Sequence, residues 1–135
     1  SVKSLNYLPS VLARIEAERA GADDALLLNT RGCLSDGTVG NVFLIQGEKL
    51  LTPALSEGPL PGTVRAAVIE MARDLGFEVM ETAISLQEVL KADEAFYTNA
   101  IQLVRPICSI SGSVIGSNKH AVSARIREAL LALEE

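Results

Sequence analysis

The most restrictive feature of this sequence is a proline- and glycine-rich stretch, residues 53–62, that runs directly into a long amphipathic segment. Such a stretch interrupts regular structure, because proline lacks an amide hydrogen and glycine weakens helices and strands. The next residues, Thr63 to Leu75, carry apolar side chains at helical spacing, and Gly76 follows them as a typical helix end. The pattern predicts a loop that leads into the start of a helix.

The length and composition indicate one globular domain. Of the 135 residues, 48% are hydrophobic and 21% are charged, which fits neither a disordered chain nor a coiled-coil rod. The formal net charge of −5 argues against nucleic-acid binding, which needs a basic surface. No apolar run approaches the ~20 residues that a membrane span needs, and no signal peptide is evident.

The cysteine and histidine content points to a reducing compartment. Cys33 and Cys108 cannot build a disulfide framework, and neither belongs to a CxxC pair. With one histidine, His120, far from both in sequence, we expect no metal site. The expectation is therefore a soluble cytoplasmic domain.

The remaining periodicities predict an α+β fold in which strands outnumber helices. A two-residue turn at Gly47-Glu48 predicts a β-hairpin, and Ser85 begins a capping box before a short helix. Further helices are predicted between Pro9 and Gly21 and over residues 120–133. Further strands are predicted at residues 25–28, 77–82, 95–98, 104–110 and 113–115, the first of them buried on both faces. We expect a mixed sheet or a distorted β-barrel flanked by helices.

Three features could carry chemistry. Lys3 has no charged neighbour before Arg14, and desolvation would favour its nucleophilic neutral amine, although most lysines are solvated. Asp36 could be a site carboxylate, but its surroundings, Ser35 to Thr38, also match an ordinary turn. The glycines before Thr63 could expose helix N–H groups to an anion, or could simply start a helix. From the residues alone, the plain interpretation is favoured for Lys3 and Asp36 and is evenly balanced for the loop.

Taken together, several segments resemble the fold-type IV pyridoxal-phosphate enzymes. This family includes D-amino-acid aminotransferases, branched-chain aminotransferases and 4-amino-4-deoxychorismate lyases. The matching segments are Lys3–Ala13, Gly21–Asn29, Ser35–Phe43, Leu60–Arg65 and Ala92–Asn99, ahead of Pro106. Their order and spacing extend over essentially the whole chain. The resemblance implies the fold of the C-terminal large domain of D-amino-acid aminotransferase-like enzymes.

The resemblance also implies residue roles around pyridoxal 5′-phosphate. Lys3 matches the catalytic lysine that joins the cofactor covalently and moves the proton of the substrate Cα. Asp36 matches a glutamate that faces the pyridine nitrogen, although aspartate is one methylene shorter. The other implied cofactor contacts are Tyr7 at the 3′ oxygen, Leu60 on the ring, Thr63 and Val64 at the phosphate, and Asn99 and Ala100 beside them. Ala100 replaces a threonine hydroxyl that many aminotransferases offer to the phosphate.

For the reaction, the resemblance favours 4-amino-4-deoxychorismate lyase, which releases pyruvate and leaves 4-aminobenzoate for folate synthesis. The Lys3–Asn6 spacing and the Asn99-Ala100 pair resemble that branch. A class IV aminotransferase, of the D-amino-acid or branched-chain type, is the alternative, and a non-catalytic fragment with the same fold is the second alternative. Members of the family carry an N-terminal domain before the lysine. We therefore expect residues 1–135 to be the C-terminal cofactor-binding domain of a larger, homodimeric enzyme with a small amino-acid-like substrate and no nucleic-acid or membrane partner.

Overall fold

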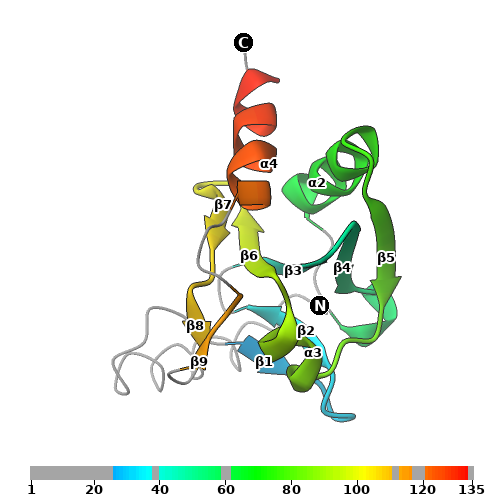
Figure 1. The fold of residues 1–135 in the computed structure, drawn as a ribbon. Helices are drawn as coiled ribbons and strands as arrows, with labels where there is room; N and C mark the ends of the chain where they lie inside the picture. Colours follow the sequence, from blue (N-terminus) through cyan, green and yellow to red (C-terminus); the bar gives the residue numbers. More distant parts are fainter. Residues whose placement is uncertain (1–25, 38–39, 59–61, 111–112, 117–120, 134–135) are drawn as a thin grey trace.

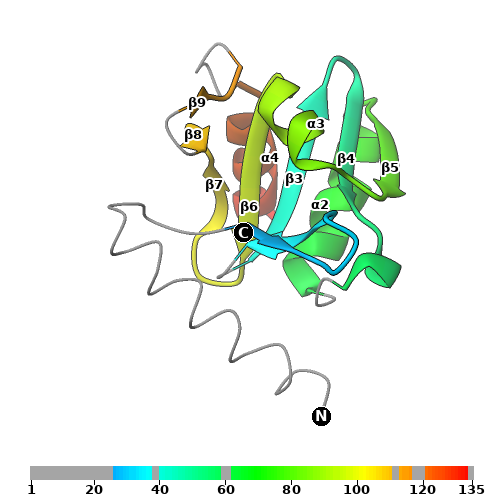
Figure 2. The same cartoon turned by 90° about the horizontal axis from the view of Figure 1, so that it is seen from below.

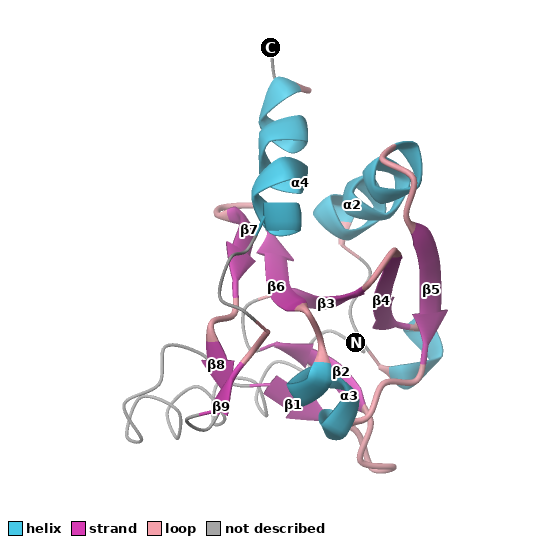
Figure 3. Ribbon diagram, in the orientation of Figure 1, coloured by secondary structure: helices cyan, strands magenta, loops and turns pink. Residues whose placement is uncertain are grey.

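The computed structural model describes residues 26–37, 40–58, 62–110, 113–116 and 121–133. The helix expected between Pro9 and Gly21 lies outside these residues, as do Lys3, Tyr7 and Leu60. Within the described residues, the fold is α+β, with a five-stranded mixed sheet flanked by helices (Figures 1 and 3). The sheet is open, so of the two expected arrangements the mixed sheet is confirmed, and not the distorted β-barrel.

The central sheet has the strand order β5-β4-β3-β6-β7. Its strands are β3 (Asn41–Gln46), β4 (Lys49–Pro53), β5 (Glu78–Thr82), β6 (Glu94–Asn99) and β7 (Leu103–Pro106). β3 and β4 form the expected hairpin, and Gly47 adopts the positive φ of 60° that such a tight turn favours. β5 runs parallel to β4, which requires a crossover connection, and helix α2 (Thr63–Asp74) supplies it.

One face of the sheet is covered by α2 and by the C-terminal helix α4 (Ala121–Ala132), as Figures 1 and 2 show. Phe43 and Phe96 stack between neighbouring strands β3 and β6, with ring centroids 5.2 Å apart. The buried residues of this cluster are Phe43, Ile45, Leu50, Val68, Ile69, Ala72, Phe96, Val104, Ile126 and Leu130. Burial of this apolar surface holds both helices against the sheet.

The opposite face carries a second buried cluster beneath shorter elements. These elements are β1 (Leu26–Leu28), β2 (Leu34–Gly37), α3 (Leu86–Lys91), β8 (Ser109–Ile110) and β9 (Ser113–Val114). A 3₁₀ helix, η1 (Leu55–Glu57), follows β4 in the chain. Ser85 caps α3 in the expected capping box with Glu88. Leu34, Val89 and Ile115 of this layer are buried against the sheet.

Two strand predictions were wrong. The run at residues 25–28 was expected to be buried on both faces, but β1 pairs with β2 in a separate two-stranded sheet and leaves Leu28 47% exposed. The single strand expected over residues 104–110 is divided into β7 and β8. Pro106 ends β7 because it has no amide hydrogen for a ladder bond. β8 then pairs with β9 instead of extending the central sheet.

Candidate functional site

Helix α2 begins with amide groups that its own N-terminal residues do not cap. Gly62 is the N-cap and makes no side-chain capping bond, and no acidic residue lies in the first turn. Thr63 is exposed and Val64 is half-buried at this end. The first N–H groups of any helix have no intrahelical acceptor, and the helix dipole adds partial positive charge there. The start of α2 therefore has the chemistry of an anion site.

Arg65 holds this end of α2 against the sheet. Its side chain is buried, and Nη2 donates to the Pro53 carbonyl at 3.1 Å and to Glu81 Oε1 at 2.9 Å. The acceptors belong to the ends of the parallel pair β4 and β5. The sequence interpretation gave Arg65 no role. A basic residue in the first turn opposes the helix dipole, and this conflict was the signal that could have revealed a tertiary partner.

Asp36 is connected to the start of α2 through a residue that the sequence interpretation missed, Asn41. Asn41 Nδ2 donates to Asp36 Oδ1 at 3.2 Å. A Cβ atom placed on Gly62 would lie 2.8 Å from Asn41 Oδ1, so the amide of Asn41 packs directly against the N-cap of α2. Asp36 lies in β2, opposite Leu27, and the interpretation of Asp36 as a turn residue was therefore wrong. The strand brings a carboxylate close to the uncapped start of α2.

The C-terminal end of β6 lies beside the N-terminal end of β3, where Asn41 is located. Asn41, the first residue of β3, is the cross-strand partner of Thr98. The backbones approach closely here, since a Cβ atom on Gly40 would lie 2.2 Å from the Thr98 carbonyl oxygen. This contact explains why glycine precedes Asn41. It also fixes the position of Asn41 relative to β6.

Asn99 and Ala100, two of the residues singled out from the sequence, follow Thr98. Asn99 Oδ1 accepts hydrogen bonds from the amides of Ile101 at 3.0 Å and Gln102 at 2.7 Å, which closes the turn between β6 and β7. Ala100 is exposed in that turn. Both residues thus lie at the end of the sheet where β6 ends and β3 begins with Asn41. The Asn99 side chain stabilises the turn that follows β6.

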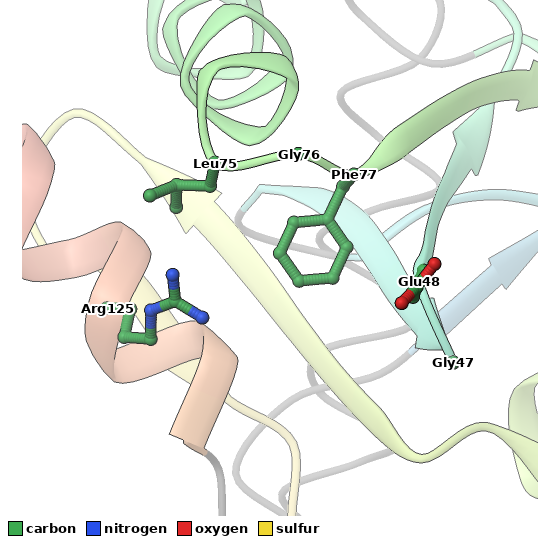
Figure 4. A pocket seen from close by; sticks show the side chains of 6 residues that line it. All are labelled: Gly47, Glu48, Leu75, Gly76, Phe77 and Arg125. Carbon is green, nitrogen blue, oxygen red and sulfur yellow. The ribbon is translucent and has the colours of Figure 1, made fainter.

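A separate surface depression of about 250 Å³ lies at the other end of α2. Figure 4 shows the side chains around it, including Phe77 after the helix and Arg125 of α4. Because α2 has 12 residues, it is about 18 Å long, and this depression is distant from Asp36 and Gly62. It therefore does not belong to the candidate site.

Neither a metal-binding cluster nor a membrane-spanning helix occurs in the described residues. No group of three or more histidine, cysteine or acidic side chains there could hold a metal ion. None of the helices in the described part of the chain is long and apolar enough to cross a membrane.

Comparison with known proteins identifies a family. A family model described as "Amino-transferase class IV" matches residues 1–110. A putative branched-chain-amino-acid aminotransferase of Methanocaldococcus jannaschii is 40% identical over 119 residues, which are 88% of this chain and 41% of that protein. The chain thus spans about two fifths of the length of this relative.

Several solved structures are similar to this chain in fold and in sequence. The branched-chain amino acid aminotransferase of Escherichia coli matches with a TM-score of 0.91 and 34% identity, over 95% of this chain and 42% of that one. A putative 4-amino-4-deoxychorismate lyase of Legionella pneumophila matches with a TM-score of 0.87 and 32% identity, over 96% and 48%. The T.th. branched-chain amino acid aminotransferase, solved with pyridoxamine 5′-phosphate, matches with a TM-score of 0.88 and 35% identity, over 93% and 42%.

Proposed function

Because this chain belongs to the class IV aminotransferase family, we propose that it is the cofactor-holding part of a pyridoxal-phosphate-dependent enzyme. The observation that carries the proposal is the connection between Asp36 and the N-cap Gly62 through Asn41. It joins a carboxylate to an anion-binding helix end across a single side chain.

The residues present fit pyridoxal 5′-phosphate at both of its charged ends. Its phosphate is an anion, which suits the uncapped start of α2, where Gly62 leaves room for close approach. Its ring nitrogen gains a proton most readily beside a carboxylate, and Asp36 is the acidic residue joined to that helix end. When bound, the cofactor supplies an electron sink for the chemistry at the substrate Cα.

The proposed roles of the individual residues follow from this fit. Asp36 keeps a proton at the ring nitrogen, and the backbone amides of Thr63 and Val64 bind the phosphate. Lys3 binds the cofactor covalently and carries the Cα proton of the substrate as acid and base. The proposal also retains Tyr7 at the 3′ oxygen, Leu60 on the ring face, and Asn99 and Ala100 near the phosphate. Both ends of the Asn99 side-chain amide are used within the turn, since Oδ1 accepts from the amides of Ile101 and Gln102 and Nδ2 donates to Gln102 Oε1 at 3.4 Å. We therefore assign a phosphate contact of this residue to its backbone amide.

For the reaction, we propose amino-group transfer between an amino acid and a keto acid. The support is that the similar proteins from M. jannaschii and E. coli are named branched-chain aminotransferases. A second candidate is 4-amino-4-deoxychorismate lyase, which the L. pneumophila structure and the Lys3–Asn6 spacing favour. We further propose that residues 1–135 act as a C-terminal domain within a longer, homodimeric protein, since the chain spans about two fifths of the relatives.

The cofactor proposal is tested by absorbance spectroscopy on the polypeptide in which this chain naturally occurs. We expect added pyridoxal 5′-phosphate to develop the absorbance band of a lysine-bound cofactor, and Lys3→Ala to abolish it. Lys49→Ala is the matched control, because Lys49 is an exposed residue of β4. No band in the unmodified protein, or an unchanged band in Lys3→Ala, would contradict the proposal.

The two reactions are separated by the need for an amino-group acceptor. An aminotransferase consumes one keto acid for each amino acid converted and shows no turnover without it. A lyase releases pyruvate from 4-amino-4-deoxychorismate with no keto acid present. Acceptor-independent pyruvate release would replace the first proposal with the second.

A further inference from the structure

Asn41 contacts both halves of the proposed site. Its amide nitrogen donates to Asp36, and its amide oxygen lies against Gly62 at the start of α2. The residue is 8% exposed, so its side chain has little freedom to move away from either neighbour. The cofactor is rigid between its ring nitrogen and the carbon that bears its phosphate group. A site for it must therefore keep the carboxylate and the amides that bind the phosphate within a narrow range of separations.

Contacts with neighbouring strands also fix the position of the Asn41 backbone. It pairs with Thr98 inside the central sheet, and the preceding Gly40 lies in close contact with the Thr98 carbonyl. The amide of Gly37 donates to the Gly40 carbonyl at 2.9 Å, which ties the end of β2 to the start of β3. Asn41 thus donates its hydrogen bond to Asp36 from a fixed position in the sheet.

We infer that Asn41 is a positioning residue that orients the Asp36 carboxylate toward the ring nitrogen of the cofactor, an inference that rests on the proposed function. Asp36 has two side-chain torsions, and a hydrogen bond from a buried donor selects among their rotamers. The orientation matters because the aspartate side chain is short and half-buried. The hydrogen bond from Asn41 thereby restricts the orientation of the Asp36 carboxylate.

The experiment compares two ligands in the full polypeptide that contains this chain. One ligand is pyridoxal 5′-phosphate, and the other is its analogue in which a CH group replaces the ring nitrogen. Asn41→Ala removes the amide, and Asn41→Leu removes the hydrogen bond but keeps most of the volume. We expect both variants to bind pyridoxal 5′-phosphate about tenfold more weakly and to bind the analogue within about threefold of the unmodified protein.

Asn29→Ala is the matched control. Asn29 Oδ1 accepts hydrogen bonds from the backbone amides of Arg31 and Cys33, in a turn that lies at the other end of β2 from Asp36. We expect this variant to bind both ligands within about threefold of the unmodified protein. The comparison accounts for the general effect of losing a hydrogen-bonded asparagine side chain near β2.

Two further variants separate positioning from packing. Asp36→Ala removes the preference for the nitrogen-containing ligand, and adding Asn41→Ala to it causes no further loss if Asn41 acts through Asp36. If circular dichroism shows that Asn41→Ala or Asn41→Leu has not folded, Asn41→Ser is measured in its place, because serine retains a small polar side chain.

The possible results are distinct. Equal weakening of both ligands in the Asn41 variants assigns the residue to packing and overturns the inference, as does unchanged binding of pyridoxal 5′-phosphate. Binding of neither ligand by the unmodified protein overturns the proposed function, and the inference with it. Selective weakening of the nitrogen-containing ligand supports both.

Discussion

The guanidinium of Arg65 donates to the carboxylate of Glu81 over 2.9 Å, although the two side chains differ greatly in exposure, at 7% and 41%. The contact joins the first turn of α2 to the edge strand β5. Such an asymmetric pair responds differently to the loss of each partner. A carboxylate that loses its partner here can be solvated, whereas a buried guanidinium cannot.

The first prediction follows from this asymmetry. Glu81→Leu leaves the buried cation without its counter-charge and should lower the free energy of unfolding by about 3 kcal/mol. Arg65→Met should cost about 1–2 kcal/mol, mainly because the Pro53 carbonyl loses a donor. Urea unfolding measures both values. A larger loss from Arg65→Met than from Glu81→Leu would contradict this account of the pair.

The second prediction concerns Gly40. A Cβ atom there would lie 2.2 Å from the Thr98 carbonyl oxygen, so Gly40→Ala must displace either β3 or β6. We expect a loss of about 2–3 kcal/mol in unfolding free energy. Gly47→Ala is the control, because Gly47 has a φ of 60° but nothing within 4 Å of an added Cβ. It should cost about 1 kcal/mol through backbone strain alone. Equal losses in the two variants would rule out the steric explanation.

The third prediction concerns the start of α4. The Glu94 carboxylate accepts from the amides of Val122 at 2.9 Å and Ser123 at 3.2 Å, so a residue of β6 caps this helix. Glu94→Gln should destabilise the protein by about 1–2 kcal/mol, because the carboxamide offers one acceptor oxygen and carries no charge for the dipole. Hydrogen exchange should accelerate at those two amides first, with the amides of α2 as the internal reference. Unchanged exchange at Val122 and Ser123 would refute the capping role.

The fourth prediction concerns Thr98. Its hydroxyl is buried and has no hydrogen-bond partner in the described structure. Thr98→Val replaces that hydroxyl with a methyl group of similar size, and should leave the unfolding free energy unchanged or raise it by up to about 1 kcal/mol. Thermal and urea unfolding provide the measurement. A loss above about 1 kcal/mol would show that the hydroxyl has a partner in solution.

Much of the local structure could be predicted because the signals are short-range. The turn at Gly47-Glu48, the helix end at Gly76 and the capping box of Ser85 each depend on residues close in sequence. The start of α2 at Thr63 depends likewise on Gly62 and the helix that follows, while anion binding there stays a prediction.

The contacts that organise the site could not be predicted in the same way. Asp36 meets Asn41 only when β2 and β3 take their places, and Arg65 meets Glu81 only when α2 packs beside β5. Hydrophobic periodicity also could not place Leu28, because a short apolar run has the same appearance in a buried strand and in a partly exposed hairpin. The resemblance marked Asp36 as a site residue, but it gave no indication that Asn41 contacts it.

The central claim, that this chain holds pyridoxal 5′-phosphate covalently on Lys3, is tested most directly by locating the attachment. The protein is loaded with the cofactor, reduced with borohydride to make the bond permanent, and digested for mass spectrometry. The account predicts the phosphopyridoxyl mass on the peptide containing Lys3 and none on those containing Lys49 or Lys91, which are exposed in the structure. Modification of Lys49 or Lys91 to the same extent as Lys3, or no modification of Lys3, would contradict it.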